Sequence, residues 1–397
     1  MFKWLYSIGL AFVSFAWLPK LFKNKYRQTL SARLGRGLSL RSDKPTRIWV
    51  HAVSLGETKA VIPLVKQLRA LYPDSFFIFS TLTATGLEAA KKEFPEADRH
   101  IYLPFDLVSR TAVKEARPTL VLLSETDFWY HFLDESKAQG ANIILVNGKL
   151  SKGSFALYKW APTLFQPIDR FLVQNEIYKR RFLALGIPES KISVSGNLKI
   201  TPLPDASSHP NQTPTLVIGS THDPEERIFL SALSDVWKKY PELKVYLVPR
   251  HPERFETVAK LIESFHIPFS RSSVGDNHKL ILVDEMGRLK SLYSQADLCA
   301  VGGSWTPKIG GHNILEPAFF GKPVIFGPYM HSQPDFLELV LSEKAGLQVP
   351  EASLSSALIH LLTYPNECKA LGQAGLALIK KNQGALDKTL AVIQSLC

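Results

Sequence analysis

The sequence predicts an α/β protein with two doubly wound, Rossmann-like domains, and three observations support this prediction. The chain has 397 residues, of which 45% are hydrophobic and 21% charged, so it can form two domains with separate cores. Strand-length apolar runs alternate with helix-length patterns in both halves, which is typical of parallel sheets covered on both faces. Residues 201–214 interrupt this alternation with four prolines and no apolar period, so we expect a linker there.

The expected strands share high apolar content and a length of six to nine residues. In the first half they are RIWVHAV (47–53), FFIFSTL (76–82), HIYLPFD (100–106), TLVLLSE (119–125), NIILVNG (142–148) and RFLVQN (170–175). In the second half they are TLVIGST (215–221), LKVYLVPRH (243–251), LILVDE (280–285), LCAVGGS (298–304) and KPVIFGP (322–328). Helical spacing then extends from about Ser353 to Leu396.

These patterns divide the chain into an N-terminal segment at 1–30, a first domain at 31–200, the linker, and a second domain with C-terminal helices at 215–397. Ligands of doubly wound folds bind beyond the carboxyl ends of the strands. We therefore expect an interdomain cleft lined by residues that directly follow strands.

The N-terminal segment contains an uncharged apolar run, WLYSIGLAFVSFAWL at 4–18, followed by four Lys or Arg residues between 20 and 27. The run is short for a spanning helix, which needs about 20 apolar residues. Charge after the run, without a small-residue cleavage site, favours an uncleaved membrane anchor helix over a signal peptide. The positive-inside rule then leaves the bulk of the chain in the cytoplasm, with residues 1–30 in contact with membrane lipids. The alternative is an amphipathic arm lying on a surface.

The net charge of +11 is concentrated at this end. Residues 1–47 hold ten of the 47 Lys and Arg residues but only one of the 36 acidic residues. Because the excess is not spread over a domain face, we expect no nucleic-acid partner. The three cysteines, Cys299, Cys368 and Cys397, form no metal-ligand spacing and fit a reducing compartment.

Several carboxylates and lysines stand at or just after expected strand ends in the first half. Glu57 lies in the first turn of the helix that follows Ser54 and Gly56, where a carboxylate can take a proton from an attacking hydroxyl. The alternative is a charge that stabilises the helix N-terminus, which this stretch alone favours. Glu125 ends another strand, and Lys199 follows a further short apolar run.

Two stretches of the second half suggest phosphate binding. Gly310–Asn313 is expected to open a helix that holds Glu316, with backbone amides at the helix start for a phosphate and the glutamate for ribose hydroxyls. The alternative is a plain turn with a capping glutamate. Arg250 and His251 follow a strand, where a guanidinium can grip a phosphate. The alternatives are that Arg250 forms a surface ion pair with Glu253 and that His251 forms hydrogen bonds only within its own turn.

Together these motifs resemble the 3-deoxy-D-manno-octulosonic acid (Kdo) transferases, glycosyltransferase family 30. The ordered matches are HAVSLGET, TLTATG, YLPFD, ETDFW, NGKLS, GNLK, STHDPEE, VPRHPERF, DEMG, YSQADL, VGGS, GGHNILEP and NQGAL. The resemblance implies a GT-B type fold and inverting, metal-independent transfer of Kdo from CMP-Kdo to the lipid A precursor lipid IVA, in lipopolysaccharide biosynthesis. It implies no cofactor and a location at the cytoplasmic face of the inner membrane.

The resemblance also implies residue roles. Glu57 matches the general base, and Glu125 and Lys199 match positions that stabilise the transition state. The segments that match the CMP-binding part are Pro249 and Arg250; Met286, Gly287 and Arg288; and Asn313, Ile314, Leu315 and Glu316. Without a DxD-type metal pair, the available groups to offset the phosphate charge are Arg250, Lys199 and the glycine-rich helix start.

Two departures from the family pattern bear on the acceptor and donor. Arg288 stands where the family usually has an acidic residue, which puts the role of its side chain in doubt. Residues 127–132 replace the family's ELWPNL and lack its proline and asparagine, so acceptor preference or the number of Kdo residues added can differ.

Two rival functions remain open at this point. One is a GT-B enzyme that transfers from a UDP-sugar to another lipid, which a preference for UDP over CMP would reveal. The other is a membrane-tethered binding protein without catalysis. A protein that has lost its activity has no physical need for all four of the candidate site residues, which are Glu57, Glu125, Lys199 and Arg250.

Overall fold

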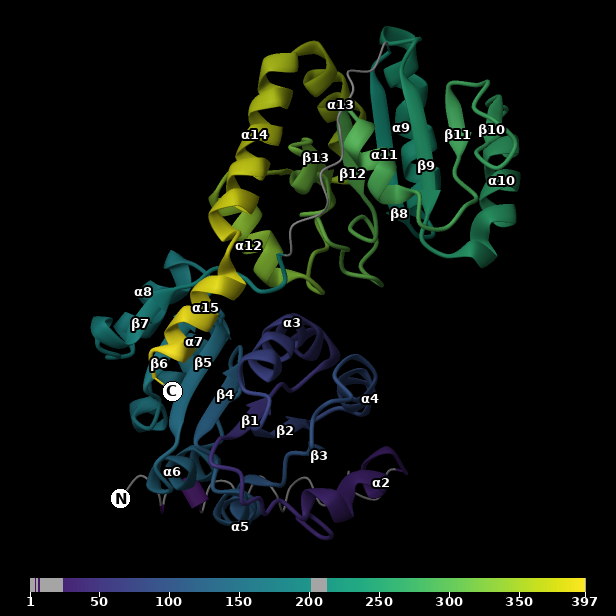
Figure 1. The fold of residues 1–397 in the computed structure, drawn as a ribbon. Coiled ribbons are helices and arrows are strands. Elements are labelled where there is room, and N and C mark those ends of the chain that lie inside the picture. The colour runs from purple at the N-terminus through teal and green to yellow at the C-terminus, as the bar shows by residue number, and fades with distance from the viewer. Residues whose placement is uncertain (1–3, 5, 8–23, 201–212, 397) are drawn as a thin grey trace. The chain divides into compact units, whose positions relative to one another are not determined.

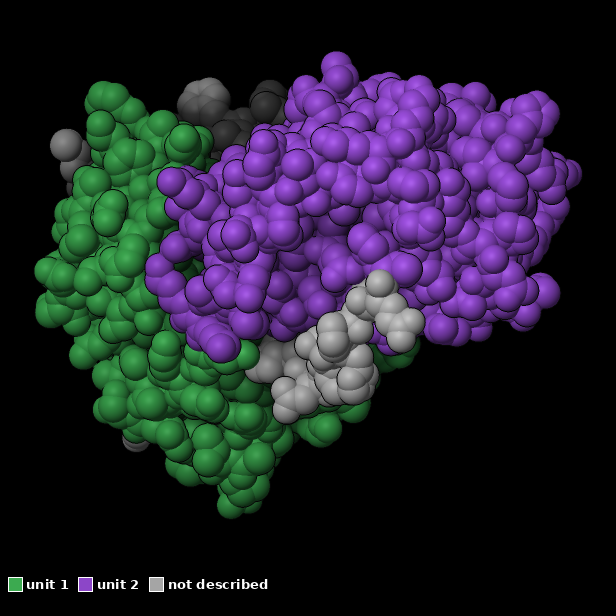
Figure 2. Space-filling view, turned by 90° about the horizontal axis from the view of Figure 1, so that it is seen from above, with its two compact units in different colours: residues 1–201, 382–397 green, residues 202–381 purple. Residues whose placement is uncertain are grey.

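The computed structural model describes residue 4, residues 6–7, residues 24–200 and residues 213–396. The chain divides into two compact units, here called unit 1 (residues 1–201 and 382–397) and unit 2 (residues 202–381), which Figure 2 distinguishes by colour. Units 1 and 2 part after residue 201, the first residue of the predicted linker. The predicted second domain, 215–397, extends too far, because residues 382–397 belong to unit 1.

Unit 1 is a seven-stranded parallel sheet with helices on both faces (Figure 1). The strand order is β3-β2-β1-β4-β5-β6-β7. The strands are β1 (Arg47–His51), β2 (Phe76–Thr81), β3 (Arg99–Tyr102), β4 (Leu120–Ser124), β5 (Asn142–Gly148), β6 (Arg170–Val173) and β7 (Ile192–Val194). The helices are α2 (Asn24–Arg33), α3 (Leu55–Leu71), α4 (Ala84–Glu93), α5 (Asp106–Ala116), α6 (Tyr130–Ala138), α7 (Lys152–Tyr158), α8 (Glu176–Ala184) and α15 (Ala385–Gln394).

The alternation of side chains in β1 shows why both faces are covered. Trp49 points into one core with Phe132, whereas Ile48 and Val50 point into the other core. Burying such a side chain contributes roughly 1.5–3 kcal/mol. Both faces therefore need a layer of helices, as the continuous apolar runs predict.

Helix α15 completes one of these layers. Its apolar side chains Leu390 and Ile393 lie in the same core as Val50 and Val61, and the Asn142 side-chain amide donates to the backbone oxygen of Leu396. The apolar face of this helix therefore packs on the sheet of unit 1.

Unit 2 has a second seven-stranded parallel sheet, in the order β10-β11-β9-β8-β12-β13-β14. Its strands are β8 (Thr215–Thr221), β9 (Lys244–Pro249), β10 (Phe269–Arg271), β11 (Leu280–Leu282), β12 (Leu298–Val301), β13 (Val324–Phe326) and β14 (Leu347–Gln348). Its helices are α9 (Glu225–Lys239), α10 (Phe255–Ser264), α11 (Leu289–Gln295), α12 (Pro334–Ser342), α13 (Leu354–Thr363) and α14 (Pro365–Asn382). Each of the eleven expected strands is present, although most end a few residues earlier. The short strands β7, β10 and β14 were not among the expected strands, although β7 lies in the short apolar run noted before Lys199.

The predicted helix at 310–316 is wrong. Gly310 and Gly311 have φ of 80° and 91°, and Glu316 lies just before the 3₁₀ helix Pro317–Phe320. Two successive residues with positive φ cannot continue a right-handed helix. The stretch is therefore a turn, as in the alternative, but the Glu316 side chain makes no capping hydrogen bond to the 3₁₀ helix.

The predicted anchor at 1–30 lies largely outside the described residues. Tyr6, which is described, packs its ring 5.3 Å from that of Tyr130 in α6. Among the described residues, no helix combines the length and apolarity needed to cross a membrane.

Candidate active site

The site of unit 1 lies at the carboxyl ends of β1 and β4. These strands pair directly, and the strand order reverses between them, which is the position where doubly wound sheets bind ligands. Glu57 follows β1 and Glu125 follows β4. The sheet therefore brings two predicted catalytic carboxylates to one edge.

Glu57 is fixed at the start of α3. Ser54 caps this helix, its hydroxyl donates to Oε1 of Glu57 at 3.0 Å, and the backbone N–H of Val53 donates to Oε2 at 3.0 Å. Burial, together with the negative charges of Glu125 and Asp127, raises the pKa of the Glu57 carboxyl to about 7, although both hydrogen bonds oppose the shift. A carboxylate with this pKa is suited to accept a proton near neutral pH.

Glu125 is buried and paired with two lysines. Its side chain is 3% exposed, and its oxygens lie 2.7 Å from Nζ of Lys149 and 2.5 Å from Nζ of Lys199. Lys199 therefore contacts Glu125 directly. The three groups carry a net charge of +1 when all are ionised.

The second lysine, Lys149, was missed as a site residue. The sequence could have identified it, because Lys149 lies in the NGKLS motif and directly follows β5. Lys199 was predicted as a group to offset donor charge, but it already contacts a carboxylate, so only part of its charge is available for a ligand.

Amide side chains hold the Lys199 segment against β5. Asn147, with a φ of 52°, accepts from the backbone N–H of Leu198 through Oδ1 at 2.9 Å and faces Glu125 through Nδ2 at 3.4 Å. Asn197 accepts from the backbone N–H of Lys199 at 2.9 Å. These bonds fix the distance between Glu125 and Lys199.

A third carboxylate, Asp127, is held beside the pair. Its Oδ2 accepts from Trp129 Nε1 and lies 3.0 Å from Nε2 of His51, which is fully buried. The other ring nitrogen of His51 contacts the Ser80 hydroxyl at 2.9 Å. Asp127 belongs to the segment that departs from the family pattern. Because its negative charge contributes to raising the pKa of Glu57, this departure affects the electrostatic environment of Glu57.

The predicted nucleotide segments lie in unit 2. Pro249 ends β9, and the backbone N–H of Arg250 donates to the Thr221 oxygen at the end of β8. The guanidinium of Arg250 is exposed, and its charge lowers the pKa of Glu316, whereas burial, the larger effect, raises it. Arg250 and Glu316 therefore share one electrostatic environment.

The other predicted nucleotide residues differ in what they offer a ligand. Ile314 and Leu315 are buried in the core, so only their backbone atoms can contact a ligand. Asn313 accepts from the backbone N–H of Leu315 at 3.1 Å. Met286 is 64% exposed, and Gly287 has a φ of 84°.

Arg288 pairs with Glu285 at 3.0 Å, three residues away. With 52% of its side chain exposed, it belongs to a surface ion pair.

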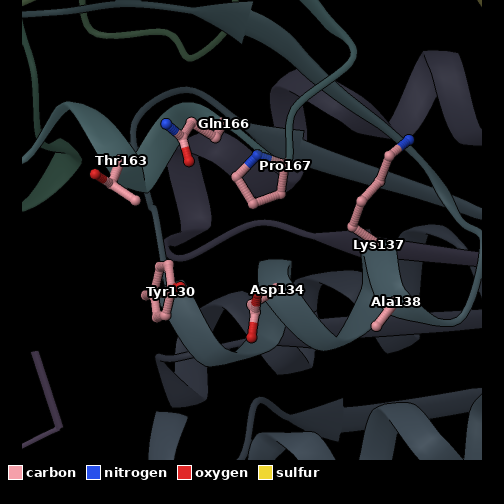
Figure 3. A pocket seen from close by; sticks show the side chains of 7 residues that line it. All are labelled: Tyr130, Asp134, Lys137, Ala138, Thr163, Gln166 and Pro167. Carbon is pink, nitrogen blue, oxygen red and sulfur yellow. The ribbon is translucent and has the colours of Figure 1, made fainter. Parts of the chain in front are cut away.

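A cavity of about 360 Å³ lies elsewhere in unit 1, between α6 and the segment around Pro167 (Figure 3). It is lined by Tyr130, Asp134, Lys137, Ala138, Thr163, Gln166 and Pro167. None of the predicted site residues lines this cavity. Its Lys137 is engaged by Asp169 at 2.7 Å.

Comparisons with known proteins cover both halves of the chain. A family model described as 3-deoxy-D-manno-octulosonic-acid transferase matches residues 28–201. The 3-deoxy-D-manno-octulosonic acid transferase of Chlamydophila psittaci is 35% identical and covers 97% of this chain and 94% of its own. The enzyme of that name from Haemophilus influenzae is 32% identical, with coverages of 93% and 92%.

Solved structures support the fold. MurG of Acinetobacter baumannii matches with a TM-score of 0.58 and 12% identity, covering 88% of this chain and 100% of its own. A glycosyltransferase of Rickettsia africae matches with a TM-score of 0.53 and 15% identity, covering 89% and 99%. Two parallel-sheet α/β domains that resemble GT-B glycosyltransferases, as predicted, are therefore confirmed.

Proposed function

Because this chain belongs to the 3-deoxy-D-manno-octulosonic acid transferase family and is therefore a glycosyltransferase, we propose that it transfers Kdo from CMP-Kdo to lipid IVA with inversion. In this proposal Glu57 is the general base and no bound metal is needed. The observation that carries it is the pair of carboxylates at the switch point of unit 1, one with a pKa of about 7 and one neutralised by lysines.

The proposed reaction is one displacement. Glu57 takes the proton of a glucosamine hydroxyl of the acceptor, and the hydroxyl oxygen forms a bond to the anomeric carbon of Kdo. The bond from that carbon to the phosphate oxygen breaks, and its electron pair leaves with CMP. A base whose pKa lies near the working pH is both ionised and able to accept the proton, which typically contributes 10²–10⁴-fold to the rate.

Glu125 and its lysines have a separate role in this proposal. The two ammonium groups fix the Glu125 carboxylate, and the net positive charge of the group stabilises negative charge that develops on the acceptor oxygen and the leaving group. Glu125 in turn keeps Glu57 basic by raising its pKa.

Unit 2 holds the donor in this proposal. CMP-Kdo carries a phosphate and a carboxylate, so the donor is doubly anionic. The exposed Arg250 guanidinium is suited to a phosphate because its fork of N–H groups matches two oxygens. The carboxyl of Glu316 can accept hydrogen bonds from ribose hydroxyls.

The lipid acceptor accounts for the basic N-terminal end. We propose that residues 1–30 contact membrane lipids at the cytoplasmic face of the inner membrane, where anionic headgroups attract Lys and Arg residues. This places the enzyme where a lipid-borne disaccharide is available.

The test uses purified full-length protein with lipid IVA and CMP-Kdo, with chelator present. Release of CMP, a lipid product larger by one or more Kdo residues in the mass spectrum, and inversion seen by NMR are expected. Transfer from a UDP-sugar instead of CMP-Kdo would favour the rival enzyme. Absence of transfer from either donor would contradict the proposal.

A further inference from the structure

Two histidines of unit 2 share a single hydrogen. Nε2 of His222 lies 2.7 Å from Nε2 of His312, and the two ring planes are inclined to each other by only 23°. A nitrogen–nitrogen contact of this length is a hydrogen bond with one donor and one acceptor. Both Nε2 atoms cannot carry hydrogen at this distance, so the pair is either neutral or carries one positive charge.

A buried carboxylate holds the two loops that carry these rings. Glu225 is fully buried and accepts from the backbone N–H groups of His222 at 2.9 Å, Gly303 at 2.7 Å and Trp305 at 2.8 Å. His222 follows β8, and Gly303 follows its neighbour β12. The clamp therefore fixes the His222 loop at the switch point of unit 2.

The glycine-rich loop brings the second ring to this point. A Cβ atom on Gly303 would lie 2.7 Å from a ring carbon of His312, and the φ of Gly303 is 70°. Only glycine allows His312 this close approach, so the loop is shaped around the histidine pair.

The surroundings oppose a positive charge on the pair in the free protein. Burial, then His222, Arg250 and His251, lower the pKa of His312 to about 4. Burial, His251, Arg254 and Arg250 lower the pKa of His222. The nearby acidic groups do not reverse this, because Glu226 is bound by Arg254 and Thr221, Glu225 is bound by backbone N–H groups, and Asp223 is exposed.

The pair is open to a ligand. Among the described residues, neither Nδ1 atom of these histidines and no nitrogen of the Arg250 side chain has a hydrogen-bond partner. These donors lie at the carboxyl ends of β8, β9 and β12, where the fold binds ligands. The strongest ligand for such a group is an anion with several oxygens.

We propose that His222, His312 and Arg250 form a phosphate site that takes up one proton from solvent when a cytidine nucleotide binds. This inference rests on the proposed function, because it assumes a cytidine nucleotide as ligand. A phosphate beside Arg250 offsets the positive field and accepts a hydrogen from an Nδ1 atom, and both effects favour the charged pair. Binding and protonation are then linked, so nucleotide affinity falls as pH rises.

Calorimetry with CMP and full-length protein tests this linkage. Titrations at one pH in two buffers of different ionisation enthalpy give the number of protons taken up. The phosphate of CMP itself titrates near pH 6, so the contribution of the pair is the difference between the wild type and His312→Gln. Gln retains a polar side chain but cannot take up the proton.

The wild type is expected to take up as much as one proton more than His312→Gln at pH 7. Its CMP affinity should exceed that of the variant roughly tenfold at pH 6 and approach it at pH 8. His222→Asn should behave like His312→Gln, and the exposed His360→Asn like the wild type. Thermal melts show whether each variant is folded.

Cytidine, which lacks the phosphate, should bind with no proton difference between wild type and variant. Equal proton numbers for CMP in wild type and both histidine variants would overturn the inference and leave the proposed donor intact. If the wild type takes up no proton when CMP binds, the inference also fails, and no comparison with a variant is needed. CMP that does not bind at any pH would overturn the proposed donor as well.

Discussion

Units 1 and 2 share a strand order around the switch point but place opposite chemistry there. In unit 1 the residues after β1 and β4 are the carboxylates Glu57 and Glu125. In unit 2 His222 follows β8 at the switch point, and Arg250 follows β9, the neighbour of β8 on the other side. Burial, reinforced by the charges of Glu125 and Asp127, raises the pKa of the Glu57 carboxyl in unit 1. Burial, reinforced by neighbouring positive charges, lowers the pKa values of His222 and His312 in unit 2. The same backbone frame thus supports a base in one unit and an anion site in the other.

The largest effect on stability is expected when the ion pairs of unit 1 are broken. Glu125→Gln removes a buried carboxylate and leaves Lys149 and Lys199 facing each other, which we expect to cost about 3–5 kcal/mol of unfolding free energy. Urea unfolding measures this cost. The control is Glu189→Gln, which breaks an exposed pair with Lys179 and should cost far less stability than Glu125→Gln. Equal losses in both variants would show that Glu125 is not held as described.

A second change tests where the boundary between the units lies. Ile393→Ala in α15 removes a fully buried side chain and should destabilise unit 1 by about 2–5 kcal/mol. Hydrogen exchange should then speed up in β1 and β5 but not in β8 and β12. The exposed neighbour Gln394→Ala should leave both sheets unchanged. Faster exchange confined to unit 2 would contradict the assignment of α15.

The contrast in pKa predicts opposite pH dependence for the two units. Glu57 titrates at about 7 in the folded chain and near 4.5 when unfolded, so the stability it contributes is present below 4.5 and lost as pH rises through 7. His312 titrates at about 4 instead of 6.5, so its contribution is present above 6.5 and lost as pH falls through 4. Each effect is at most about 3 kcal/mol and is reduced by solvent screening.

Two variants separate these contributions. Glu57→Gln should unfold at higher urea concentration than the wild type at pH 8, with a smaller gap at pH 5. His312→Gln should lose the destabilisation that the wild type shows between pH 6.5 and pH 4. If Glu57→Gln increases the stability to urea by the same amount at pH 5 and pH 8, burial does not raise the pKa of the Glu57 carboxyl.

The smallest effect is expected at Arg288. Because its side chain is half exposed and its ion pair within the described residues is with Glu285, Arg288→Ala should change CMP affinity less than about threefold, about 0.7 kcal/mol. Calorimetry with CMP measures this, and Arg250→Ala provides the contrasting variant with a larger loss. A tenfold or greater loss at Arg288 would mean that its side chain contacts the nucleotide.

Residues that follow buried strands could be predicted from the sequence. Apolar runs mark the ends of β1 and β4, and in a parallel sheet these ends lie at one edge, so Glu57 and Glu125 could be placed near each other. The contact between Glu125 and Lys199 could not be predicted in the same way. It depends on Asn147, whose hydrogen bond to the backbone of Leu198 joins residues 51 positions apart, and on Asn197, which holds the backbone of Lys199 locally.

Two errors have physical causes. The glycines at 310 and 311 were interpreted as a helix start, but glycine also permits the positive φ that they adopt, and composition does not separate these cases. The helical spacing that extends to about Leu396 was assigned to the second domain, but periodicity does not say on which sheet a helix packs, and α15 packs on the sheet of unit 1. Both outcomes depend on contacts distant in sequence.

The central claim is that Glu57 performs the proton transfer while unit 2 binds the nucleotide. The most direct test measures turnover and CMP affinity on the same preparations of wild type, Glu57→Gln and the exposed control Glu88→Gln. We predict that Glu57→Gln lowers kcat by about 10²–10⁴-fold with CMP affinity unchanged, and that the control matches the wild type. A Glu57→Gln enzyme that turns over at the wild-type rate would contradict the claim.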